Sequence, residues 1–249
     1  MIRAFIFDLD GTLVQTEKLK ALSYARAAAE LCPEAVTEDE VIEAFKDVVG
    51  RSRREVATAL VERFKLAEAA GAQMDSVGVQ TPWQAYVQIR LRHYEQILAD
   101  PDVLRRNQWP HNMALLRQAR AAHCLVGLAT MSHCGQVQRV LQILEMAGLF
   151  DFIATRDDVE HAKPDPEIYE LVATELATPP SECLVIEDSP SGVQAALAAG
   201  MHCIAVTTPF TRTHLHQQQL LEERWIIDNP EQLLATVEQM LKEEGTTAL

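Results

Sequence analysis

Short apolar runs alternate with helical patterns through the second half of the chain, and this alternation constrains the fold most strongly. Four runs have the length and composition of buried strands, and amphipathic segments of helical length separate or follow them. The strands are predicted at residues 125–129, 152–154, 183–186 and 203–206, and the helices at residues 135–146, 164–176, 191–199 and 230–242. This alternation predicts an α/β fold in which helices cover both faces of a parallel sheet.

The first half follows a different pattern after a single strand. Residues 4–7 predict a buried strand, whereas residues 16–98 carry helical patterns rich in Ala, Glu and Arg. Helices are predicted at residues 18–31, 38–48, 53–69 and 82–98, with a polar loop at residues 71–80. We therefore predict a Rossmann-like core formed by residues 1–14 and 108–249, with an all-helical cap domain inserted at residues 15–107.

Composition narrows the classes of partner. The net charge of −14 repels nucleic-acid backbones, and no block rich in Lys or Arg offsets it. The five cysteines are scattered and form no C-x-x-C pair, which is typical of free thiols in a reducing compartment. The N-terminus has no signal-peptide pattern, and no uncharged run has the length of a membrane span. We expect a cytoplasmic monomer without a nucleic-acid or membrane partner.

Four polar segments stand where the predicted strands end. They are residues 8–12, residues 130–132, residues 161–163 and residues 187–188. The carboxyl ends of parallel strands share one edge of the sheet, which is where ligands bind in folds of this class. We therefore expect these segments to meet at one site.

The residue types in these segments indicate phosphoryl transfer. Clustered carboxylates from Asp8, Asp10, Glu187 and Asp188, without a His or Cys beside them, favour a hard cation such as Mg²⁺. Lys163 supplies a point charge suited to phosphate. Asp8 can act as the nucleophile, and Asp10 can protonate the leaving alcohol and later accept a proton from water. The hydroxyls of residues 130 and 132 add donors for the phosphoryl oxygens.

Taken together, these motifs resemble the haloacid dehalogenase superfamily of phosphatases and mutases. The resemblance covers residues 1–14 and about 110–210. The motifs that carry it are Asp8-Leu9-Asp10-Gly11-Thr12, Thr130, Lys163-Pro164-Asp165-Pro166 and the run from Ile186 to Ala196, Glu187-Asp188 included. The position of the helical insert is similar to that in the β-phosphoglucomutase-like branch, which implies a cap domain that closes over the substrate.

The resemblance implies specific roles in the core. Asp8 is phosphorylated during turnover. Mg²⁺ is held by the Asp8 side chain, the backbone carbonyl of Asp10 and Asp188, and Glu187 helps through water.

Further implied roles concern the phosphoryl group and the cap. Thr130 and Lys163 hold the phosphoryl group. Arg53, in the segment Gly50-Arg51-Ser52-Arg53, matches a residue that contacts substrate in the resembling branch. The alternative interpretation is a solvated arginine at the start of a helix. Lys20 is a second substrate-binding candidate, at a position where the branch often carries His. Thr16 is a third, and belongs to a hinge or caps the first cap helix.

Three functions remain open at this point. The leading hypothesis is a Mg²⁺-dependent phosphatase acting on a small phosphorylated metabolite. The alternative is a sugar-phosphate mutase like β-phosphoglucomutase, in which Ser-Lys-Asn follows the second motif; this chain has Ser132-His133-Cys134 there, which keeps only the substrate-binding Ser132. The third is a phosphate-binding protein without catalysis, since fold does not imply function.

Overall fold

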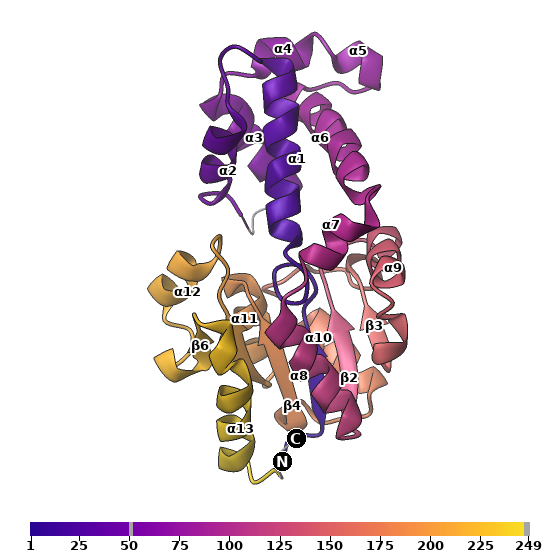
Figure 1. Ribbon diagram of the computed structural model, residues 1–249, viewed down its shortest axis with the longest axis vertical. Helices are drawn as coiled ribbons and strands as arrows, with labels where there is room; N and C mark the ends of the chain where they lie inside the picture. Colours follow the sequence, from indigo (N-terminus) through magenta and orange to yellow (C-terminus); the bar gives the residue numbers. More distant parts are fainter. Residues whose placement is uncertain (50–51, 247–249) are drawn as a thin grey trace. The chain divides into compact units, whose positions relative to one another are not determined.

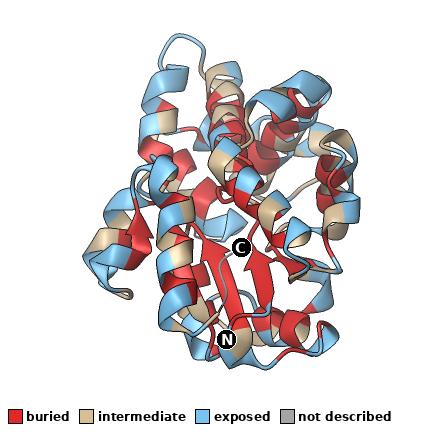
Figure 2. Ribbon diagram, turned by 60° about the horizontal axis from the view of Figure 1, so that its bottom comes forward, coloured by how far each residue is buried: buried red, intermediate tan, exposed pale blue. Residues whose placement is uncertain are grey.

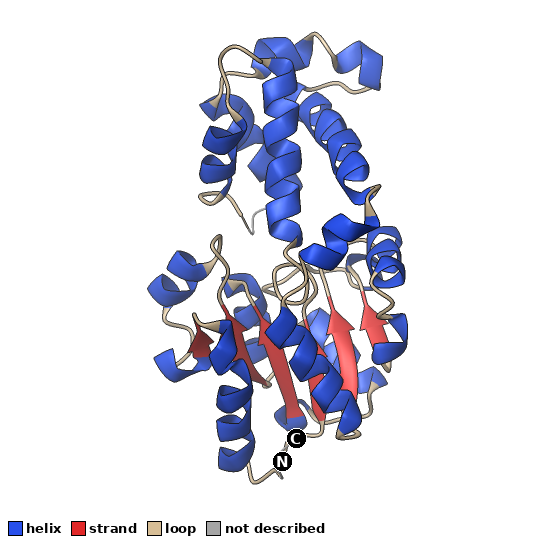
Figure 3. Ribbon diagram, in the orientation of Figure 1, coloured by secondary structure: helices blue, strands red, loops and turns tan. Residues whose placement is uncertain are grey.

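The computed structural model describes residues 1–49 and 52–246, and these form two compact units. One unit comprises Met1–Gln15 and Leu104–Leu249, and the other comprises Thr16–Val103. All strands of the described chain lie in the first unit, as Figure 3 shows. Within the described residues, no helix is long and apolar enough to cross a membrane.

The first unit is built on a six-stranded parallel sheet with the order β3-β2-β1-β4-β5-β6. Its strands are β1 (Ala4–Phe7), β2 (Leu125–Ala129), β3 (Phe152–Ala154), β4 (Cys183–Glu187), β5 (His202–Val206) and β6 (Ile226–Ile227). Strands β2 and β3 lie on one side of β1 in the sheet, and β4, β5 and β6 lie on the other side. The predicted α/β fold with a Rossmann-like parallel sheet is confirmed.

Helices pack on both faces of this sheet. They are α8 (Pro110–Ala121), α9 (Cys134–Ile143), α10 (Glu167–Glu175), α11 (Pro190–Ala198), α12 (Arg212–Gln218) and α13 (Leu233–Glu243), with 3₁₀ turns η1 (Ala147–Leu149), η2 (Arg156–Asp158), η3 (Pro180–Glu182), η4 (Glu223–Trp225) and η5 (Pro230–Gln232). Helix α10 contacts β1, β2 and β3, α11 contacts β4 and β5, and α8 contacts β2 and packs on α13.

The alternation of side chains along β1 explains why the strand is apolar throughout. Ala4 and Ile6 belong to a buried cluster with Tyr169 and Val172 of α10. Phe5 points to the opposite face, because successive side chains of a strand alternate, and it too is fully buried. Figure 2 shows the strands as buried. A central strand covered on both faces has no room for polar side chains until it ends.

The second unit contains only helices among its described residues (Figure 1). They are α1 (Thr16–Leu31), α2 (Glu38–Phe45), α3 (Arg53–Arg63), α4 (Ala67–Gly71), α5 (Met74–Val77) and α6 (Pro82–Leu98), and α7 (Pro101–Arg106) crosses the boundary between the units. Helix α6 packs against α1, α3, α4 and α5. Tyr86 of α6 is fully buried, and its hydroxyl donates to the Tyr24 carbonyl at 2.8 Å.

The helical segments differ from the prediction in several places. The helix predicted at residues 53–69 is two helices, because Lys65 adopts a left-handed conformation with φ 55°. The loop predicted at residues 71–80 contains the short helix α5. The helix predicted from residue 164 begins at Glu167 instead, where its backbone N–H is bonded by Asp165 Oδ1 at 3.0 Å.

Candidate active site

The carboxyl ends of β1, β2 and β4 bring the predicted polar segments together. Phe7 of β1 pairs with Leu128 on one side and with Ile186 on the other, so the next residue of each strand reaches the same edge. The backbone N–H of Asp8 donates to the Ile186 carbonyl at 3.1 Å, which extends the hydrogen bonding between β1 and β4 by one residue. The strand order reverses at β1, because β2 and β3 are added on one side of it and β4, β5 and β6 on the other. Such a switch point is where ligands bind in open α/β sheets.

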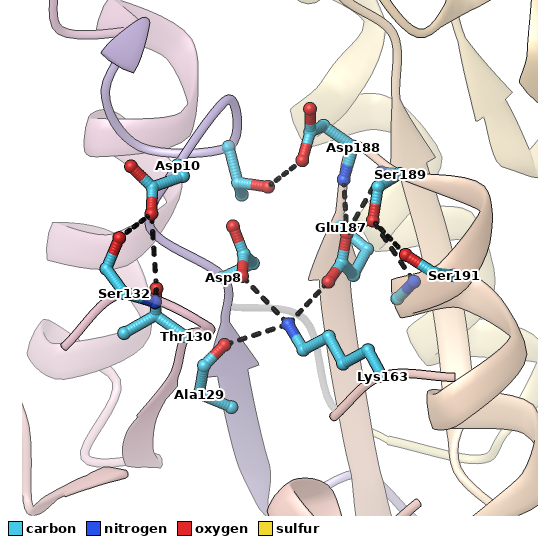
Figure 4. Close-up of polar contacts among 12 residues, drawn as sticks. Asp8, Asp10, Ala129, Thr130, Ser132, Lys163, Glu187, Asp188, Ser189 and Ser191 are labelled. Carbon is cyan, nitrogen blue, oxygen red and sulfur yellow. Dashed lines mark hydrogen bonds and ion pairs between the residues drawn. The ribbon is translucent and has the colours of Figure 1, made fainter. Parts of the chain in front are cut away.

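Lys163 lies at the centre of this group, as Figure 4 shows. Its Nζ donates to Asp8 Oδ1 at 2.8 Å, to Glu187 Oε1 at 2.7 Å and to the Ala129 carbonyl at 3.0 Å. Only 4% of the lysine side chain is exposed. The ammonium also lies 4.8 Å from the centroid of the Tyr169 ring. One buried cation, from the segment that precedes α10, therefore contacts the carboxyl ends of β1, β2 and β4.

Glu187 is held by donors on every side. It accepts from the Tyr169 hydroxyl at 2.9 Å, from the Asp188 N–H at 2.8 Å, and from the N–H and hydroxyl of Ser189, both at 3.0 Å. Ser189 is also the N-cap of α11, and its hydroxyl accepts from the Gly192 N–H at 3.1 Å. A Cβ at Gly192 would lie 1.8 Å from Glu187 Oε1, so this helix can begin here only with glycine at that position.

Asp10 and Asp188 lie at the outer part of the site. Asp10 Oδ2 accepts from the Ser132 hydroxyl and, at 3.4 Å, from the Thr130 hydroxyl. The Thr12 hydroxyl donates to Asp188 Oδ1 at 3.4 Å. Asp10 is only half-buried, whereas Asp188 is 1% exposed. Asp10 can therefore meet a molecule arriving from solvent, as a general acid must.

Burial and crowding dominate the electrostatics. Burial raises the pKa of Asp8 to about 8, since the lowering effect of Lys163 is outweighed by burial and by the negative charges of Glu187 and Asp10. Burial alone would lower the pKa of Lys163, but the negative charges of Asp8 and Glu187 raise it. Burial alone would raise the pKa of Glu187, but the charge of Lys163 and the hydrogen bonds to the carboxylate lower it. The site holds more carboxylates than cations, so an additional positive charge would stabilise it.

The donor set fits a divalent metal ion. Carboxylate oxygens of Asp8, Glu187 and Asp188 lie within 4.8 Å of one another, and all three residues are buried. Gly11 leaves room for this cluster, because a Cβ there would lie 2.1 Å from Asp188 Oδ2 and its φ of 91° disfavours other residues. Oxygen ligands alone favour Mg²⁺ or a similar hard cation.

The seven core residues predicted from sequence therefore meet at one place. They are Asp8, Asp10, Thr130, Ser132, Lys163, Glu187 and Asp188. The three cap candidates lie in the other unit: Thr16 is the buried first residue of α1, Lys20 is half-buried on the same helix, and Arg53 is the exposed first residue of α3. Gly50 and Arg51, which belong to the same predicted segment as Arg53, lie outside the described residues.

Sequence reasoning missed the residues that orient Glu187. Tyr169 lies in the helix predicted at residues 164–176, where a tyrosine on a buried face usually needs a partner for its hydroxyl. Ser189 and Gly192 lie in the motif from Ile186 to Ala196, which predicts no individual role for either residue. The Ser189-Pro190 pair, typical of an N-cap followed by the first helical residue, was the available signal.

Comparison with known proteins identifies the family. The family model described as haloacid dehalogenase-like hydrolase matches residues 5–206, which include every core residue of the site. The chain belongs to the haloacid dehalogenase-like hydrolases. The resemblance seen in the sequence motifs is thereby confirmed.

Three relatives of this hydrolase carry names that state an activity. It is 29% identical to the validoxylamine A 7′-phosphate phosphatase of Streptomyces hygroscopicus subsp. limoneus, over 90% of this chain and 97% of that one. It is 30% identical to the phosphorylated carbohydrates phosphatase of Thermotoga maritima, over 82% and 84% of the two chains. It is 30% identical to the phosphoglycolate phosphatase of Salmonella typhimurium, over 83% and 81%. The hydrolase is accordingly a phosphatase, as predicted.

Solved structures agree on the fold. The β-phosphoglucomutase of Clostridium difficile superimposes with a TM-score of 0.69 over 98% of this chain and 99% of that one, at 22% identity. At that identity the likeness concerns the fold alone.

Proposed function

We propose that this hydrolase is a Mg²⁺-dependent phosphatase that transfers the phosphoryl group of a small metabolite to Asp8 and then to water. The contact of Lys163 with both Asp8 and Glu187 carries the proposal, because a buried cation beside the attacking carboxylate would attract the phosphoryl oxygens. The relatives named above act on a validoxylamine phosphate, on phosphorylated carbohydrates and on phosphoglycolate, which supports a small phosphate ester as substrate.

Two displacements at phosphorus complete the reaction. An Asp8 oxygen attacks phosphorus, the bond to the leaving oxygen breaks, and Asp10 gives that oxygen its proton, so that an alcohol departs and an aspartyl-phosphate remains. Asp10 then takes a proton from a water molecule, whose oxygen attacks the same phosphorus. The bond to Asp8 breaks, and inorganic phosphate leaves with both side chains restored.

The other side chains hold the phosphoryl group and the metal ion. Thr130, Ser132 and Lys163 are the proposed contacts to the phosphoryl oxygens. Bound Mg²⁺ would neutralise charge on those oxygens in the transition state. Its proposed ligands are the carboxylates of Asp8 and Asp188 and the backbone carbonyl of Asp10.

Glu187 contributes differently in this proposal. Its oxygens are already engaged by Tyr169, Ser189 and Lys163, so its contribution to the ion passes through water.

Phosphate release from an aryl phosphate, measured with and without Mg²⁺, tests the proposal. We expect activity only with the metal, and a loss of at least about 10³-fold in Asp8→Asn. Glu175→Gln, at an exposed position of α10, is the control and should keep full activity. Phosphate binding without release would favour a non-catalytic protein. Formation of glucose 6-phosphate from β-glucose 1-phosphate with a bisphosphate primer would favour the mutase.

A further inference from the structure

The segment that follows β2 in the α/β unit lies against the 3₁₀ turn η2, which follows β3. The Thr130 N–H donates to the Ala154 carbonyl at 3.1 Å, and the Arg156 N–H donates to the Ser132 carbonyl at 3.1 Å. These two bonds extend the contact between the neighbouring strands beyond their ends. The backbone at residues 130–132 is therefore held by a segment that contributes no side chain to the acidic cluster.

Asp157 of η2 holds the next two residues of the same segment. Its Oδ1 lies 2.6 Å from His133 Nδ1, and its Oδ2 accepts from the Cys134 N–H at 2.8 Å. These bonds, with that of His133 first, lower the pKa of Asp157, so the side chain is a carboxylate at neutral pH. Cys134 is the first residue of α9, and a negative charge is favourable at a helix N-terminus.

The turn that carries Asp157 has its own fixed geometry. The N–H and the hydroxyl of Thr155 donate to Asp158 Oδ2 at 2.8 and 2.7 Å. The Asp157 N–H donates in turn to the Thr155 hydroxyl at 3.3 Å. Thr155 is 4% exposed, so the turn is anchored in the core of the unit. The Asp157 carboxylate therefore reaches residues 133 and 134 from a rigid support.

The other side of the same segment reaches the site. The Ser132 hydroxyl donates to Asp10 Oδ2, and the Thr130 hydroxyl donates to the same oxygen at 3.4 Å (Figure 4). The Ser132 N–H donates to the Thr130 hydroxyl at 3.1 Å. Two hydroxyl donors on one oxygen restrict the rotation of the Asp10 carboxylate. Ser132 precedes His133 directly, so a displacement of residues 133 and 134 moves one of these two donors.

We propose that Asp157 is a positioning residue for catalysis, because it keeps the Ser132 hydroxyl bonded to Asp10. The inference rests on the proposed phosphatase function, in which Asp10 protonates the leaving oxygen. General acid catalysis contributes about 10²–10⁴-fold and requires the acid to lie within hydrogen-bonding reach of its target. A carboxylate that only capped α9 would affect stability and leave the protonation of the leaving group unchanged.

Two aryl esters of similar shape test the proposal with Mg²⁺ and the full-length protein. p-Nitrophenol leaves readily as an anion, whereas phenol needs a proton, so phenyl phosphate depends more strongly on a correctly placed acid. We expect Asp157→Ala to raise the ratio of kcat/KM for p-nitrophenyl phosphate to that for phenyl phosphate by about 3–10-fold. Both values come from one protein sample, so partial unfolding cancels from the ratio.

Asn229→Ala is the matched control in the same unit. Its exposed side chain accepts from the Glu231 N–H at 3.1 Å in the turn η5, so the change removes a comparable bond from a 3₁₀ turn. The ratio should stay at the wild-type value in this variant.

A double-mutant cycle tests whether Asp157 acts through Ser132. Ser132→Ala should itself raise the ratio, because Asp10 loses a donor. Adding Asp157→Ala to that variant should then change the ratio by less than about twofold, since the group through which Asp157 acts is already absent. A further rise as large as that in the single variant would overturn the proposal, and so would an unchanged ratio in Asp157→Ala.

A crystal structure of Asp157→Ala provides an arm that needs no turnover. We expect the Ser132 hydroxyl to lie more than about 3.5 Å from both Asp10 oxygens, beyond hydrogen-bonding distance. A retained bond would overturn the positioning role, whatever the reaction. Absence of Mg²⁺-dependent hydrolysis of both esters by the wild type would instead contradict the phosphatase function, so the two failures are distinguishable.

Discussion

Glu187 shows how one carboxylate can organise a site through the donors around it. Lys163, Tyr169 and Ser189 each approach it from a different element, and together they fix its rotamer. Groups that orient a metal's surroundings in this way influence its affinity nearly as strongly as the ligands do. The orientation of Asp8 follows from the same arrangement, because Lys163 bonds both carboxylates.

Tyr169→Phe tests this arrangement by removing one donor and keeping the ring beside Lys163. We expect Mg²⁺ affinity, measured from the activity of an aryl-phosphate assay, to fall about tenfold. The free energy of unfolding should fall by about 1 kcal/mol, because a buried acceptor loses a hydrogen bond. Tyr86→Phe is the control, since it loses a comparable buried bond, to the Tyr24 carbonyl, within the helical unit. A similar loss of Mg²⁺ affinity in both variants would contradict the role assigned to Tyr169.

The charged residues of the site could be predicted from sequence, and the residues that orient them could not. Asp8 and Asp188 directly follow apolar strands, so their position along the chain also gives their position at the edge of the sheet. Tyr169 reaches Glu187 from the first turn of α10, a helix that begins three residues later than the pattern indicates. Its contact depends on the rotation of α10 over the sheet, which tertiary packing decides.

At the scale of elements, the strongest patterns were predicted with the correct ends. Residues 82–98, 125–129 and 152–154 form the predicted helix and strands. Helix α8 was missed, although Pro110 at its first turn and the buried Met113, Leu116 and Ala119 gave a helical signal. Strand β6 has two residues and could not be distinguished from a loop. A strand as short as β6 forms because a neighbouring strand completes its hydrogen bonds. A pattern within a few residues of sequence cannot predict which distant segment will lie beside it.

Helix α11 begins against the site, so its first turn can be tested through Gly192. We expect Gly192→Ala to lower kcat/KM for an aryl phosphate by about 10–100-fold, because the new methyl group displaces Glu187. The free energy of unfolding should fall by about 1–3 kcal/mol from overpacking. Gly135→Ala in α9 is the control, since nothing lies within 4 Å of its Cβ position. That variant should keep its activity and gain up to about 1 kcal/mol of stability from helix propensity. Equal activity in both variants would show that catalysis does not depend on the position of the Glu187 side chain.

Helix α12 is tied to the segment after β6 by an ion pair that depends on pH. His216 Nε2 lies 3.1 Å from Asp228 Oδ1, and Nδ1 lies 3.0 Å from Glu223 Oε2. The bond to Asp228 raises the pKa of His216. Partial burial alone would raise the pKa of Asp228, but the bonds from His216 and Thr207 and the charges of His216 and Arg212 together lower it. Arg212 pairs with the same aspartate at 2.6 Å.

The sign of the pH effect follows from these shifts. The contribution of His216 is fully present below its unfolded pKa of about 6.5 and is lost as pH rises through the higher folded value. Urea unfolding should therefore show His216→Gln less stable than wild type at pH 5.5, by under about 1 kcal/mol at this exposure. The difference should shrink at pH 8.5. His214→Gln is the matched control, because it removes an imidazole ring from the same helix and leaves the pair of His216 with Asp228 in place. A constant difference in His216→Gln would show that the pair adds nothing.

At the scale of the whole molecule, the net charge of −14 complicates any test of metal binding. Divalent cations screen repulsion among all 36 acidic residues, so they stabilise such a chain even without a specific site. A specific site differs in saturating with ligand concentration and in depending on particular carboxylates. The three buried carboxylates belong to the α/β unit, so specific stabilisation should be seen in the unfolding of that unit.

Tryptophan fluorescence in Trp83→Phe isolates this unit, because Trp83 lies in the helical unit and Trp109 and Trp225 lie in the α/β unit. At 100 times its Kd, Mg²⁺ should stabilise the unit by about 2.7 kcal/mol, which corresponds to a rise in Tm of about 5–10 °C. Asp188→Asn should abolish the rise. Because that change also removes one negative charge, Glu175→Gln serves as the matched control and should keep it. An equal and non-saturating rise in all three proteins would assign the effect to screening, and the buried carboxylates would then hold no ion.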